Sequence, residues 1–413
     1  MSHVVIVGAG QAGLVAAETL RAGGFEGAIS LLGDEPDGPY HRPPLSKAWL
    51  AGEIDAAQLT MRAPGILAKK GISLRTATAV RAIDRAARVV RLADGSALEY
   101  TGLVLATGAT PRALPLPGAR SPNVLALRSR DDATAIAARL ALCAEQARPL
   151  VVIGGGFIGM EVAATARKKG VDVTVLEAAP RLMARALPPV LSDWYATLHR
   201  RHGVEVVLGA GVAGIDVEDG LAVAVRTADG ARRRCGLVLV GVGVVQNDAL
   251  AREAGLACDR GIIVDDCCRT EDPAITAAGD CTARRLADGT LLRLESVNNA
   301  NEQGKSAATA LLGTPRPFTG APWFWSDQYD CKLQMAGLSA GADQTVVRGS
   351  TDTPPFSVFH FRAGRLVAAD TINAPREHLL VRKLLDAGLS PTPQQAADTA
   401  FDLNSLLAAP PPR

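Results

Sequence analysis

The pattern of apolar residues begins with the parts of one βαβ unit. Val4–Val7 reads as a short buried strand, and the glycine-rich turn Gly8–Gly13 follows it directly. An alanine-rich helical stretch then runs to Arg21, and a second apolar strand spans Ala28–Leu32. Strand, glycine turn, helix and parallel strand in this order predict a crossover unit of an α/β sheet.

The same pattern returns in the middle of the chain. Leu150–Ile153 predicts a strand, Gly154–Gly159 a turn, Glu161–Lys169 a helix, and Val171–Leu176 the next strand, which ends at Glu177. A repeat of this kind predicts two dinucleotide-binding sites in one chain.

Alternating stretches joined by Asp-Gly turns predict a β-meander inside each repeat. They are Val89–Leu92, before Asp94-Gly95, and Ala222–Arg226, before Asp229-Gly230. A strand that ends in glycine follows each meander. These strands are Leu103–Thr107, which leads into Gly108, and Leu237–Val240, which leads into Gly241-Val242-Gly243.

The composition changes after about residue 320, where a third region begins. Three strands and a helix are expected in it: Gln344–Arg348, Phe356–Phe361, Leu366–Thr371 and Glu377–Asp386. We therefore expect a discontinuous first domain at residues 1–113 and 247–320, a second at 114–246, and a C-terminal domain at 321–413.

Each glycine turn has the context that the dinucleotide fingerprint requires, because it follows a strand, opens a helix and precedes an acid. The first glycines (Gly8, Gly154) permit the turn, the second (Gly10, Gly156) let amides approach a pyrophosphate, and the third (Gly13, Gly159) let helix pack on strand. Glycines that only tighten turns would explain one such motif, but they explain two in matching context poorly.

Asp34 and Glu177 stand where a carboxylate can bind an adenosine ribose. A carboxylate at Glu177 would repel a ribose 2′-phosphate, so NADH is expected to bind better than NADPH. Arg181 and Arg185 could soften this preference, although ordinary solvated arginines are the simpler interpretation.

Composition excludes several classes of function. The 413 residues carry a net charge of +2, with 48% hydrophobic and 21% charged residues, which gives no general nucleic-acid or membrane signature. A local basic patch stays possible. The first strand leaves no room for a signal peptide, and the cysteines are odd in number, so a reducing cytoplasm is expected.

The cysteines also argue against a disulfide reductase. The first is Cys143, and neither Cys-x-x-Cys nor Cys-x-x-x-x-Cys occurs, while the vicinal Cys267-Cys268 is read as two half-buried thiols. The early region also lacks the single cysteine of a flavin peroxidase. Scattered histidines and cysteines predict no metal site, so an iron–sulfur cluster would have to be on a partner.

Several specific strings add to the glycine turns. They are Arg42-Pro43-Pro44-Leu45-Ser46-Lys47, Ala106-Thr107-Gly108-Ala109, Ala278-Gly279-Asp280-Cys281, Glu295-Ser296-Val297 and Trp323-Phe324-Trp325-Ser326-Asp327-Gln328. With these strings and the glycine turns, the chain closely resembles the putidaredoxin reductase-like family over essentially its whole length. Its members are the FAD-containing ferredoxin reductases of bacterial cytochrome P450 and aromatic-ring dioxygenase systems.

The resemblance implies an α/β fold with two interleaved Rossmann-type dinucleotide-binding domains, glutathione-reductase-like, plus a C-terminal α+β domain. It implies FAD contacts at Gly8, Gly10, Ala12, Gly13, Asp34, Arg42, Lys47, Val80, Thr107, Gly108, Arg128, Gly279, Asp280 and Val297. It implies NADH contacts at Gly154, Gly156, Ile158, Gly159, Glu177 and Gly243.

Within that family pattern, Lys47 resembles a lysine beside the reactive edge of the flavin, and Glu161 a carboxylate that pairs with it. A buried lysine needs such a partner, although a surface lysine after the proline loop Pro36–Leu45 is the plainer alternative. Asp280 is expected to bind ribityl hydroxyls at a helix N-terminus, or else only to cap that helix. Trp325 either covers the flavin or packs in a domain interface.

The implied activity is electron transfer from NADH through FAD to a [2Fe–2S] ferredoxin that feeds a cytochrome P450 or similar oxygenase. Arg62, Lys305 and Lys332 are candidates for docking an acidic ferredoxin, with generic surface charge as the alternative. Three alternatives remain open: a rubredoxin reductase or NADH oxidase, a signalling flavoprotein resembling apoptosis-inducing factor, and a binding module without flavin.

Overall fold

The structure, a computed structural model, describes residues 2–408. By its internal contacts the chain divides into two compact units. The first unit comprises Met1–His41, Ala56–Thr110 and Val244–Thr319, and the second comprises Arg42–Asp55, Pro111–Gly243 and Gly320–Arg413. The domain boundaries expected from the sequence stay a prediction.

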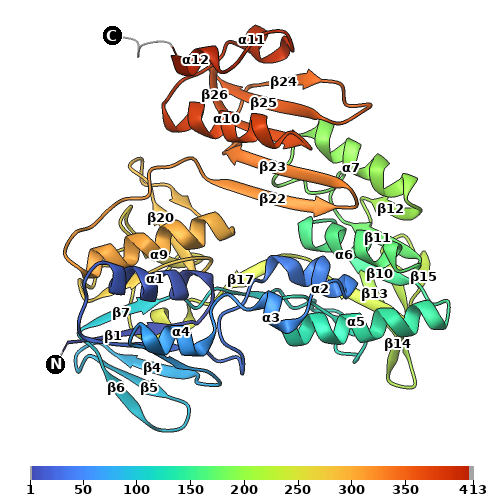
Figure 1. Ribbon diagram of the computed structural model, residues 1–413. Helices are drawn as coiled ribbons and strands as arrows, with labels where there is room; N and C mark the ends of the chain where they lie inside the picture. The colour runs from blue at the N-terminus through green and yellow to red at the C-terminus, as the bar shows by residue number, and fades with distance from the viewer. Residues whose placement is uncertain (1, 409–413) are drawn as a thin grey trace. The chain divides into compact units, whose positions relative to one another are not determined.

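The first unit is built on a five-stranded parallel sheet with the order β19-β7-β1-β2-β3. The strands are β1 (His3–Val7), β2 (Ala28–Leu32), β3 (Ile72–Arg75), β7 (Gly102–Leu105) and β19 (Ile275–Ala277). Helices α1 (Gln11–Ala22) and α9 (Val297–Leu311) lie side by side on one face (Figure 1).

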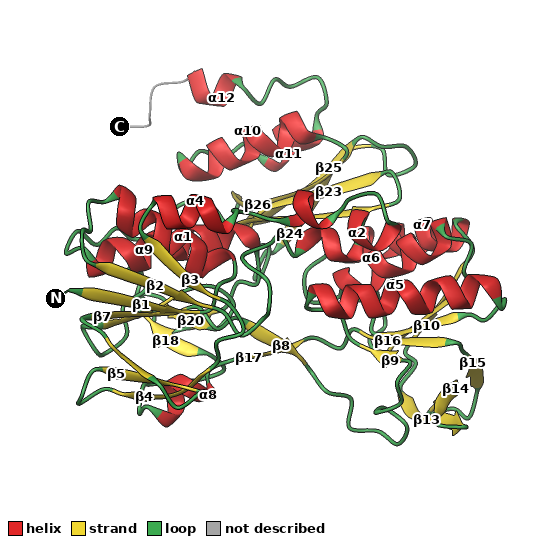
Figure 2. Cartoon of the chain, turned by 60° about the horizontal axis from the view of Figure 1, so that its bottom comes forward, coloured by secondary structure: helices red, strands yellow, loops and turns green. Residues whose placement is uncertain are grey.

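Alternation along β1 explains how this sheet is covered on both faces. Val4 and Ile6 pack with the helices α1 and α9, whereas Val5 and Val7 pack on the opposite side. That side meets the predicted meander, which forms as β4 (Val80–Asp84), β5 (Val89–Leu92) and β6 (Ala97–Glu99) (Figure 2). A strand of period two with both faces apolar is typical of a buried parallel sheet.

The first unit has further elements around this sheet. They are α3 (Ala56–Leu59), α4 (Pro64–Lys69), α8 (Ala249–Glu253), β17 (Val244–Gln246), β18 (Ile262–Val264), β20 (Thr282–Arg285) and β21 (Leu291–Leu292). Strands β18, β20 and β21 form a small sheet.

The second unit repeats the same architecture with the strand order β12-β11-β10-β16-β9. Its strands are β9 (Val124–Leu125), β10 (Leu150–Ile153), β11 (Val173–Glu177), β12 (Val204–Leu208) and β16 (Leu237–Val240). Its helices are α5 (Arg130–Glu145), α6 (Phe157–Lys168) and α7 (Pro189–Arg201). The second predicted meander forms as β13 (Val212–Glu218), β14 (Leu221–Thr227) and β15 (Arg232–Arg234), across the sheet from α5 and α6 (Figure 2).

The C-terminal part of the second unit is an antiparallel sheet with the order β22-β23-β26-β25-β24. Its elements are β22 (Trp323–Gln328), β23 (Cys331–Gly337), β24 (Gln344–Gly349), β25 (Phe356–Arg362), β26 (Arg365–Ile372), α10 (Pro375–Asp386), α11 (Pro393–Ala397) and α12 (Ser405–Ala408). Phe359, Phe361, Val381 and Leu384 form the core between the sheet and α10.

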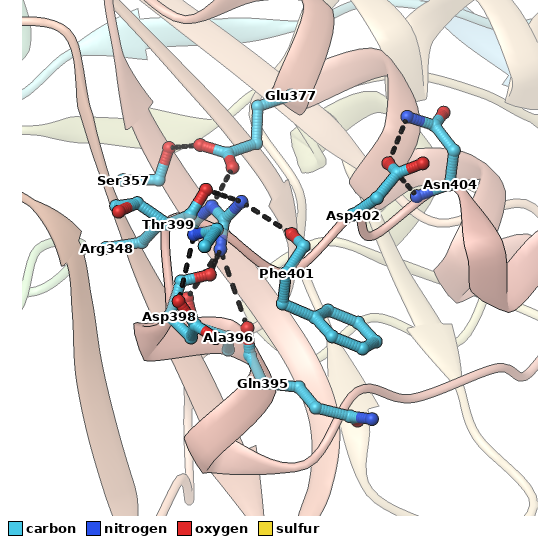
Figure 3. A network of polar contacts seen from close by, with 11 residues as sticks. Arg348, Ser357, Glu377, Gln395, Ala396, Asp398, Thr399, Phe401, Asp402 and Asn404 are labelled. Carbon is cyan, nitrogen blue, oxygen red and sulfur yellow. Dashed lines mark hydrogen bonds and ion pairs between the residues drawn. The ribbon is translucent and has the colours of Figure 1, made fainter.

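One arginine ties the last segments to this sheet. The Arg348 guanidinium on β24 pairs with Glu377 of α10 at 2.7 Å, and Glu377 also accepts a hydrogen bond from Ser357 (Figure 3). The same guanidinium donates to the carbonyls of Asp398 and Phe401 beyond α11 (Figure 3). Arg348 therefore cross-links residues 398–401 to the sheet, and these carbonyls and Glu377 are the acceptors that its guanidinium needs.

The end of the proline loop, from Arg42 onward, belongs to the second unit rather than the first. Pro43–Ser46 forms a short 3₁₀ helix, η1, and α2 (Ala48–Ala51) follows it. The Thr165 hydroxyl on α6 donates to the Ser46 carbonyl at 2.9 Å. This anchoring places Lys47 beside α6, where it can contact Glu161.

Candidate functional site

The first glycine turn forms because its glycines allow contacts that a side chain would block. Gly8 has φ +111°, and a Cβ there would lie 2.1 Å from the Ala106 carbonyl oxygen. A Cβ at Gly13 would lie 1.9 Å from the Gly8 carbonyl oxygen, so α1 packs directly on the turn. Gly10 is the N-cap of α1, has no side-chain cap, and no heavy atom lies within 4 Å of a Cβ built on it.

The second turn has the same geometry. Gly154 has φ +104°, and its Cβ would lie 2.4 Å from the Gly241 carbonyl oxygen, while a Cβ at Gly159 would lie 2.3 Å from the Gly154 oxygen. Gly156 is the N-cap of α6, again without a side-chain cap and with nothing within 4 Å of its Cβ position. Ile158, in the first turn of α6, is 43% exposed, which is high for an isoleucine. Its side chain is therefore accessible to a ligand at this turn.

These two turns suit the phosphates of dinucleotides. Each puts the first amides of a 12-residue helix at a surface that side chains leave open. The unpaired amides and the positive end of the helix dipole attract an anion there. The residues present therefore fit both FAD and a nicotinamide nucleotide, with Ala12 buried in the first turn of α1.

The two acids differ in register. Gly8 donates to Leu32 and Gly154 donates to Leu176, so the position that corresponds to Glu177 in the first repeat is Gly33. Asp34 therefore stands one residue farther along, and it is exposed. The Glu177 carboxylate, by contrast, accepts hydrogen bonds from the amides of Gly155 at 2.6 Å and Ala179 at 2.7 Å.

Arg181 is not the solvated arginine that the sequence suggests. Its guanidinium donates to the carbonyls of Ala184 and Leu187 and to the Ser192 hydroxyl, which shapes the loop between β11 and α7. Arg185 lies near Gly243, whose Cβ position is 3.6 Å from the guanidinium.

The first unit gathers a second group of expected cofactor residues around Gly279. The Gly279 amide donates to Gln303 of α9 at 2.8 Å, and a Cβ on Gly279 would lie 3.1 Å from the Ala12 methyl. Val297 is the first residue of α9 and follows its N-cap, Ser296. Gly279 thus lies where α1 and α9 begin to pack.

The alternative that Asp280 only caps a helix is wrong, because a turn and strand β20 follow it. The helix that packs beside Gly279 is α9, much later in the chain. The strand end itself is where the sequence places it, because β19 ends at Ala277.

The other expected FAD residues are divided between the two units. In the first unit, Thr107 donates to the Asn247 carbonyl at 2.6 Å, Gly108 has φ +67°, and Val80 begins β4. Arg42, Lys47 and Arg128 belong to the second unit, where Arg42 donates to the Arg128 carbonyl at 2.9 Å.

Lys47 and Glu161 form a buried ion pair in the second unit, with Lys47 Nζ 2.6 Å from Glu161 Oε2. The Glu161 side chain is 5% exposed and that of Lys47 19%, so the pair is shielded from water. Helix α6 begins at Phe157, four residues before the predicted start, so Glu161 lies in its second turn rather than its first. There the carboxylate also accepts hydrogen bonds from the hydroxyls of Ser46 and Ser326.

Strand β22 presents different chemistry on its two faces. The Trp325 ring lies 5.4 Å from that of Trp323 on one face. On the other face Phe324 contacts Phe157, the first residue of α6, with ring centroids 4.7 Å apart, and Ser326 reaches Glu161. The alternation of a strand thus separates the tryptophans from the Glu161 contacts.

The sequence analysis did not single out four polar residues that the fold brings to Glu161 and its surroundings: Ser46, Ser326, Gln328 and His199. No alternating pattern marks Ser326 and Gln328, because Asp327 between them is also polar. Nothing in the sequence singles out His199 on α7.

Two of the three docking candidates have acidic neighbours. Arg62 pairs with Glu18 at 2.9 Å, and Lys305 pairs with Glu302 at 2.8 Å, both within the first unit. Lys332 is exposed on β23 and has no ion pair within residues 2–408.

Other potential chemistry is limited. All seven cysteines are free thiols, and Cys268 is buried rather than half-buried. In the described part of the chain no cluster of His, Cys, Asp or Glu has the size needed to hold a metal ion. No helix between residues 2 and 408 combines the length and the apolar character that crossing a membrane requires.

Comparison with known families gives two matches that together span most of the chain. A model described as pyridine nucleotide-disulphide oxidoreductase matches residues 2–304, and one described as reductase C-terminal matches residues 323–407.

The matched proteins are similar to this chain over nearly their full lengths. Rhodocoxin reductase of Rhodococcus erythropolis is 49% identical over 98% of this chain and 94% of its own length. Putidaredoxin reductase of Pseudomonas putida is 43% identical over 98% of this chain and 97% of its own.

Solved structures agree with the sequence matches. The ferredoxin reductase for the CYP199A2 system from Rhodopseudomonas palustris superimposes with a TM-score of 0.95 at 43% identity, covering 99% of this chain and 100% of that one. The covalent putidaredoxin reductase–putidaredoxin complex gives a TM-score of 0.94 at 42% identity, with 98% of each chain covered.

Proposed function

This chain belongs to the pyridine nucleotide-disulphide oxidoreductase family, and from that premise we propose that it is an FAD-dependent NADH:ferredoxin oxidoreductase. Its ferredoxin would carry a [2Fe–2S] cluster and feed a cytochrome P450 or a similar oxygenase. The observation that carries the proposal is the repeated glycine turn, with open space beside Gly10 and Gly156 at two helix N-termini.

The first unit would hold FAD. The turn at Gly8–Gly13 would bind the pyrophosphate, Asp34 the adenosine ribose, and Asp280 the ribityl hydroxyls. The exposed Asp34 carboxylate supports this assignment, because it is available to a ligand. A bound FAD would supply the redox chemistry that couples a two-electron donor, NADH, to a one-electron acceptor.

The second unit would hold NADH. The turn at Gly154–Gly159 would bind its pyrophosphate, and Glu177 its ribose. The two amide hydrogen bonds to Glu177 support this role, because they fix the carboxylate at the end of β11. We assign FAD to the domain at residues 1–113 and 247–320 and NADH to that at 114–246.

Lys47 and Glu161 would set the polarity beside the reacting rings, and neither needs to donate a proton. A buried pair with no net charge places a cation at a fixed point without the cost of an isolated charge. Trp325 would lie near the same rings.

The partner would be an acidic ferredoxin that electrostatic attraction steers to a basic surface. The names of the relatives support this class of partner, and one of them is solved as a complex with putidaredoxin. Among the three docking candidates, Lys332 is the strongest, because Glu18 and Glu302 offset Arg62 and Lys305.

The proposal is tested with purified protein and no added cofactor. We expect flavin bands in the visible spectrum, complete bleaching by NADH under anaerobic conditions, and fast turnover only with a [2Fe–2S] ferredoxin. A colourless protein, or bands that NADH does not bleach, would refute the proposal.

The alternatives give different results in the same assay. Fast peroxide formation in air without ferredoxin identifies an NADH oxidase, and preference for rubredoxin identifies a rubredoxin reductase. Slow reduction to a long-lived complex that passes electrons to no carrier supports the signalling flavoprotein.

A further inference from the structure

A continuous chain of buried hydrogen bonds leads away from Glu161 inside the second unit. Ser326 Oγ lies 2.6 Å from Glu161 Oε1, Gln328 Nε2 lies 3.2 Å from Ser326 Oγ, and His199 Nε2 lies 2.8 Å from Gln328 Oε1. The Tyr329 hydroxyl then lies 3.3 Å from His199 Nδ1. Ser326, Gln328 and His199 are all at most 1% exposed, so no water competes for these contacts.

Every donor in this chain points toward Glu161. The Gln328 amide nitrogen donates to Ser326, so the Ser326 hydroxyl is left to donate to the carboxylate. The Gln328 oxygen accepts from His199, which requires the proton of the neutral imidazole on Nε2, and Nδ1 then accepts from Tyr329. The second Gln328 proton faces Met183 Sδ at 3.9 Å, a weak acceptor that opposes a flip of the amide.

We propose that Ser326, Gln328 and His199 are positioning residues for the Lys47–Glu161 pair, and that the charge on Glu161 sets the direction of the whole chain. Ser46 and Lys47 donate to one carboxylate oxygen, whereas Ser326 is the donor to the other. With Ser326 held in that orientation, both carboxylate oxygens have donors and the group cannot rotate away from Lys47. Burial also lowers the pKa of His199 to about 4, so its ring is neutral and has a defined tautomer.

The inference rests on the proposed function only in giving the Lys47–Glu161 pair a role in the reaction. The hydrogen-bond direction itself is a property of the chain, and it can be measured without turnover. If the hydrogen-bond direction is refuted, the reductase assay is unaffected. If the reductase activity is refuted, the hydrogen-bond direction can still be measured.

Glu161→Gln gives the decisive test, because it keeps the shape and reverses one end of the chain. The new amide oxygen is expected to stay beside Lys47 and Ser46, which are both donors, so its NH₂ group faces Ser326 Oγ. The Ser326 hydroxyl then has no acceptor at residue 161, so we expect it to donate to Gln328. In that case the Gln328 amide flips and the His199 proton moves from Nε2 to Nδ1.

The tautomer of His199 is read from long-range ¹H–¹⁵N correlations of the ¹⁵N-histidine-labelled holoprotein. We expect an Nε2–H tautomer in the native protein and an Nδ1–H tautomer in Glu161→Gln, although the two residues are not in contact. His360 is an internal control in the same spectrum, because its Nε2 faces Asp370 at 2.8 Å and its signals should not change.

Ser326→Ala cuts the chain next to Glu161. We expect the His199 signals of Ser326→Ala and of the double variant Glu161→Gln/Ser326→Ala to be the same, because His199 no longer senses residue 161. An Nδ1–H tautomer in the native protein, an unchanged tautomer in folded Glu161→Gln, or a Glu161→Gln effect that survives Ser326→Ala would each overturn the proposal.

Discussion

The Glu177 carboxylate accepts a hydrogen bond from the backbone amide of Gly155, 2.6 Å away across the second glycine turn. A Cβ at Gly155 would lie 3.2 Å from the same carboxylate oxygen and 2.5 Å from a Leu182 methyl. In the first repeat the small and the large residue are exchanged. Gly33 stands in place of the acid, and a Cβ on Gly33 would lie 2.8 Å from the Ala9 methyl, which fills this space. Each repeat therefore has room for only one side chain where the glycine turn meets the end of the second strand. In the first repeat it is Ala9 of the turn, and in the second it is Glu177 of the strand.

Glu177→Ala is expected to raise the KM for NADH and to leave the flavin content unchanged. Loss of hydrogen bonds from a charged acceptor costs about 1.5–3 kcal/mol, which is roughly a 10- to 100-fold change. Steady-state kinetics and the flavin-to-protein absorbance ratio measure the two effects. Glu177→Gln is the matched control that keeps the shape, and kinetics equal to the native protein's in Glu177→Ala would refute the ribose role.

Gly10→Ala and Gly156→Ala test the two phosphate sites separately. Apart from its chain neighbours, the added methyl meets no heavy atom within 4 Å in either case, so no clash inside the protein is expected. We expect Gly10→Ala to be purified with little flavin, and Gly156→Ala to keep its flavin and bind NADH weakly. Gly65→Ala, also in open space, is the control that should change neither, and an unaffected Gly10→Ala would contradict the FAD assignment.

Lys47→Met should destabilise the second unit, because it leaves the Glu161 carboxylate buried without its cation. Removal of one partner from a buried pair costs about 3 kcal/mol or more, whereas an exposed pair is worth about 0.2–1 kcal/mol. Lys70→Met is the matched control, since Lys70 lies 2.6 Å from Glu18 and is 43% exposed. Melting midpoints that fall equally in both variants would argue against a buried charge at Glu161, and Lys47→Met/Glu161→Gln should recover most of the loss.

Acid should destabilise the protein through its buried histidines. Burial lowers the pKa of His378 from 6.5 to about 4, with a further contribution from Arg382. Between these two pH values the unfolded chain binds a proton that the folded chain does not, so stability falls as the pH drops through this window and levels off below about 4.

His378→Phe should remove the contribution of His378 to this loss of stability, which is at most roughly 3 kcal/mol. The melting midpoint should then fall less steeply as the pH is lowered. Some decline should remain from His199, whose pKa is also lowered to about 4. Calorimetry of both proteins across the window makes the comparison, and identical pH profiles would rule out His378 as a contributor.

Lys332→Glu should slow ferredoxin reduction at low ionic strength by roughly tenfold and reduce its dependence on salt. Arg62→Glu and Lys305→Glu should have smaller effects, because Glu18 and Glu302 already offset these charges. Stopped-flow rates at several salt concentrations make the comparison. Equal salt dependence in native protein and Lys332→Glu would remove Lys332 from the docking surface.

The sequence alone determined the two βαβ repeats, both meanders and the glycine turns, because these depend on local periodicity and on glycines that only a tight backbone requires. Only the tertiary structure decided which residues surround Glu161. Its direct partners include Lys47, after the proline loop, and Ser326 on the edge strand β22, and the hydrogen bonds continue from β22 to His199 on α7. No local sequence pattern predicts such long-range contacts. Tertiary structure likewise decided that α9 is the helix beside Gly279, since packing rather than sequence order brings that helix there.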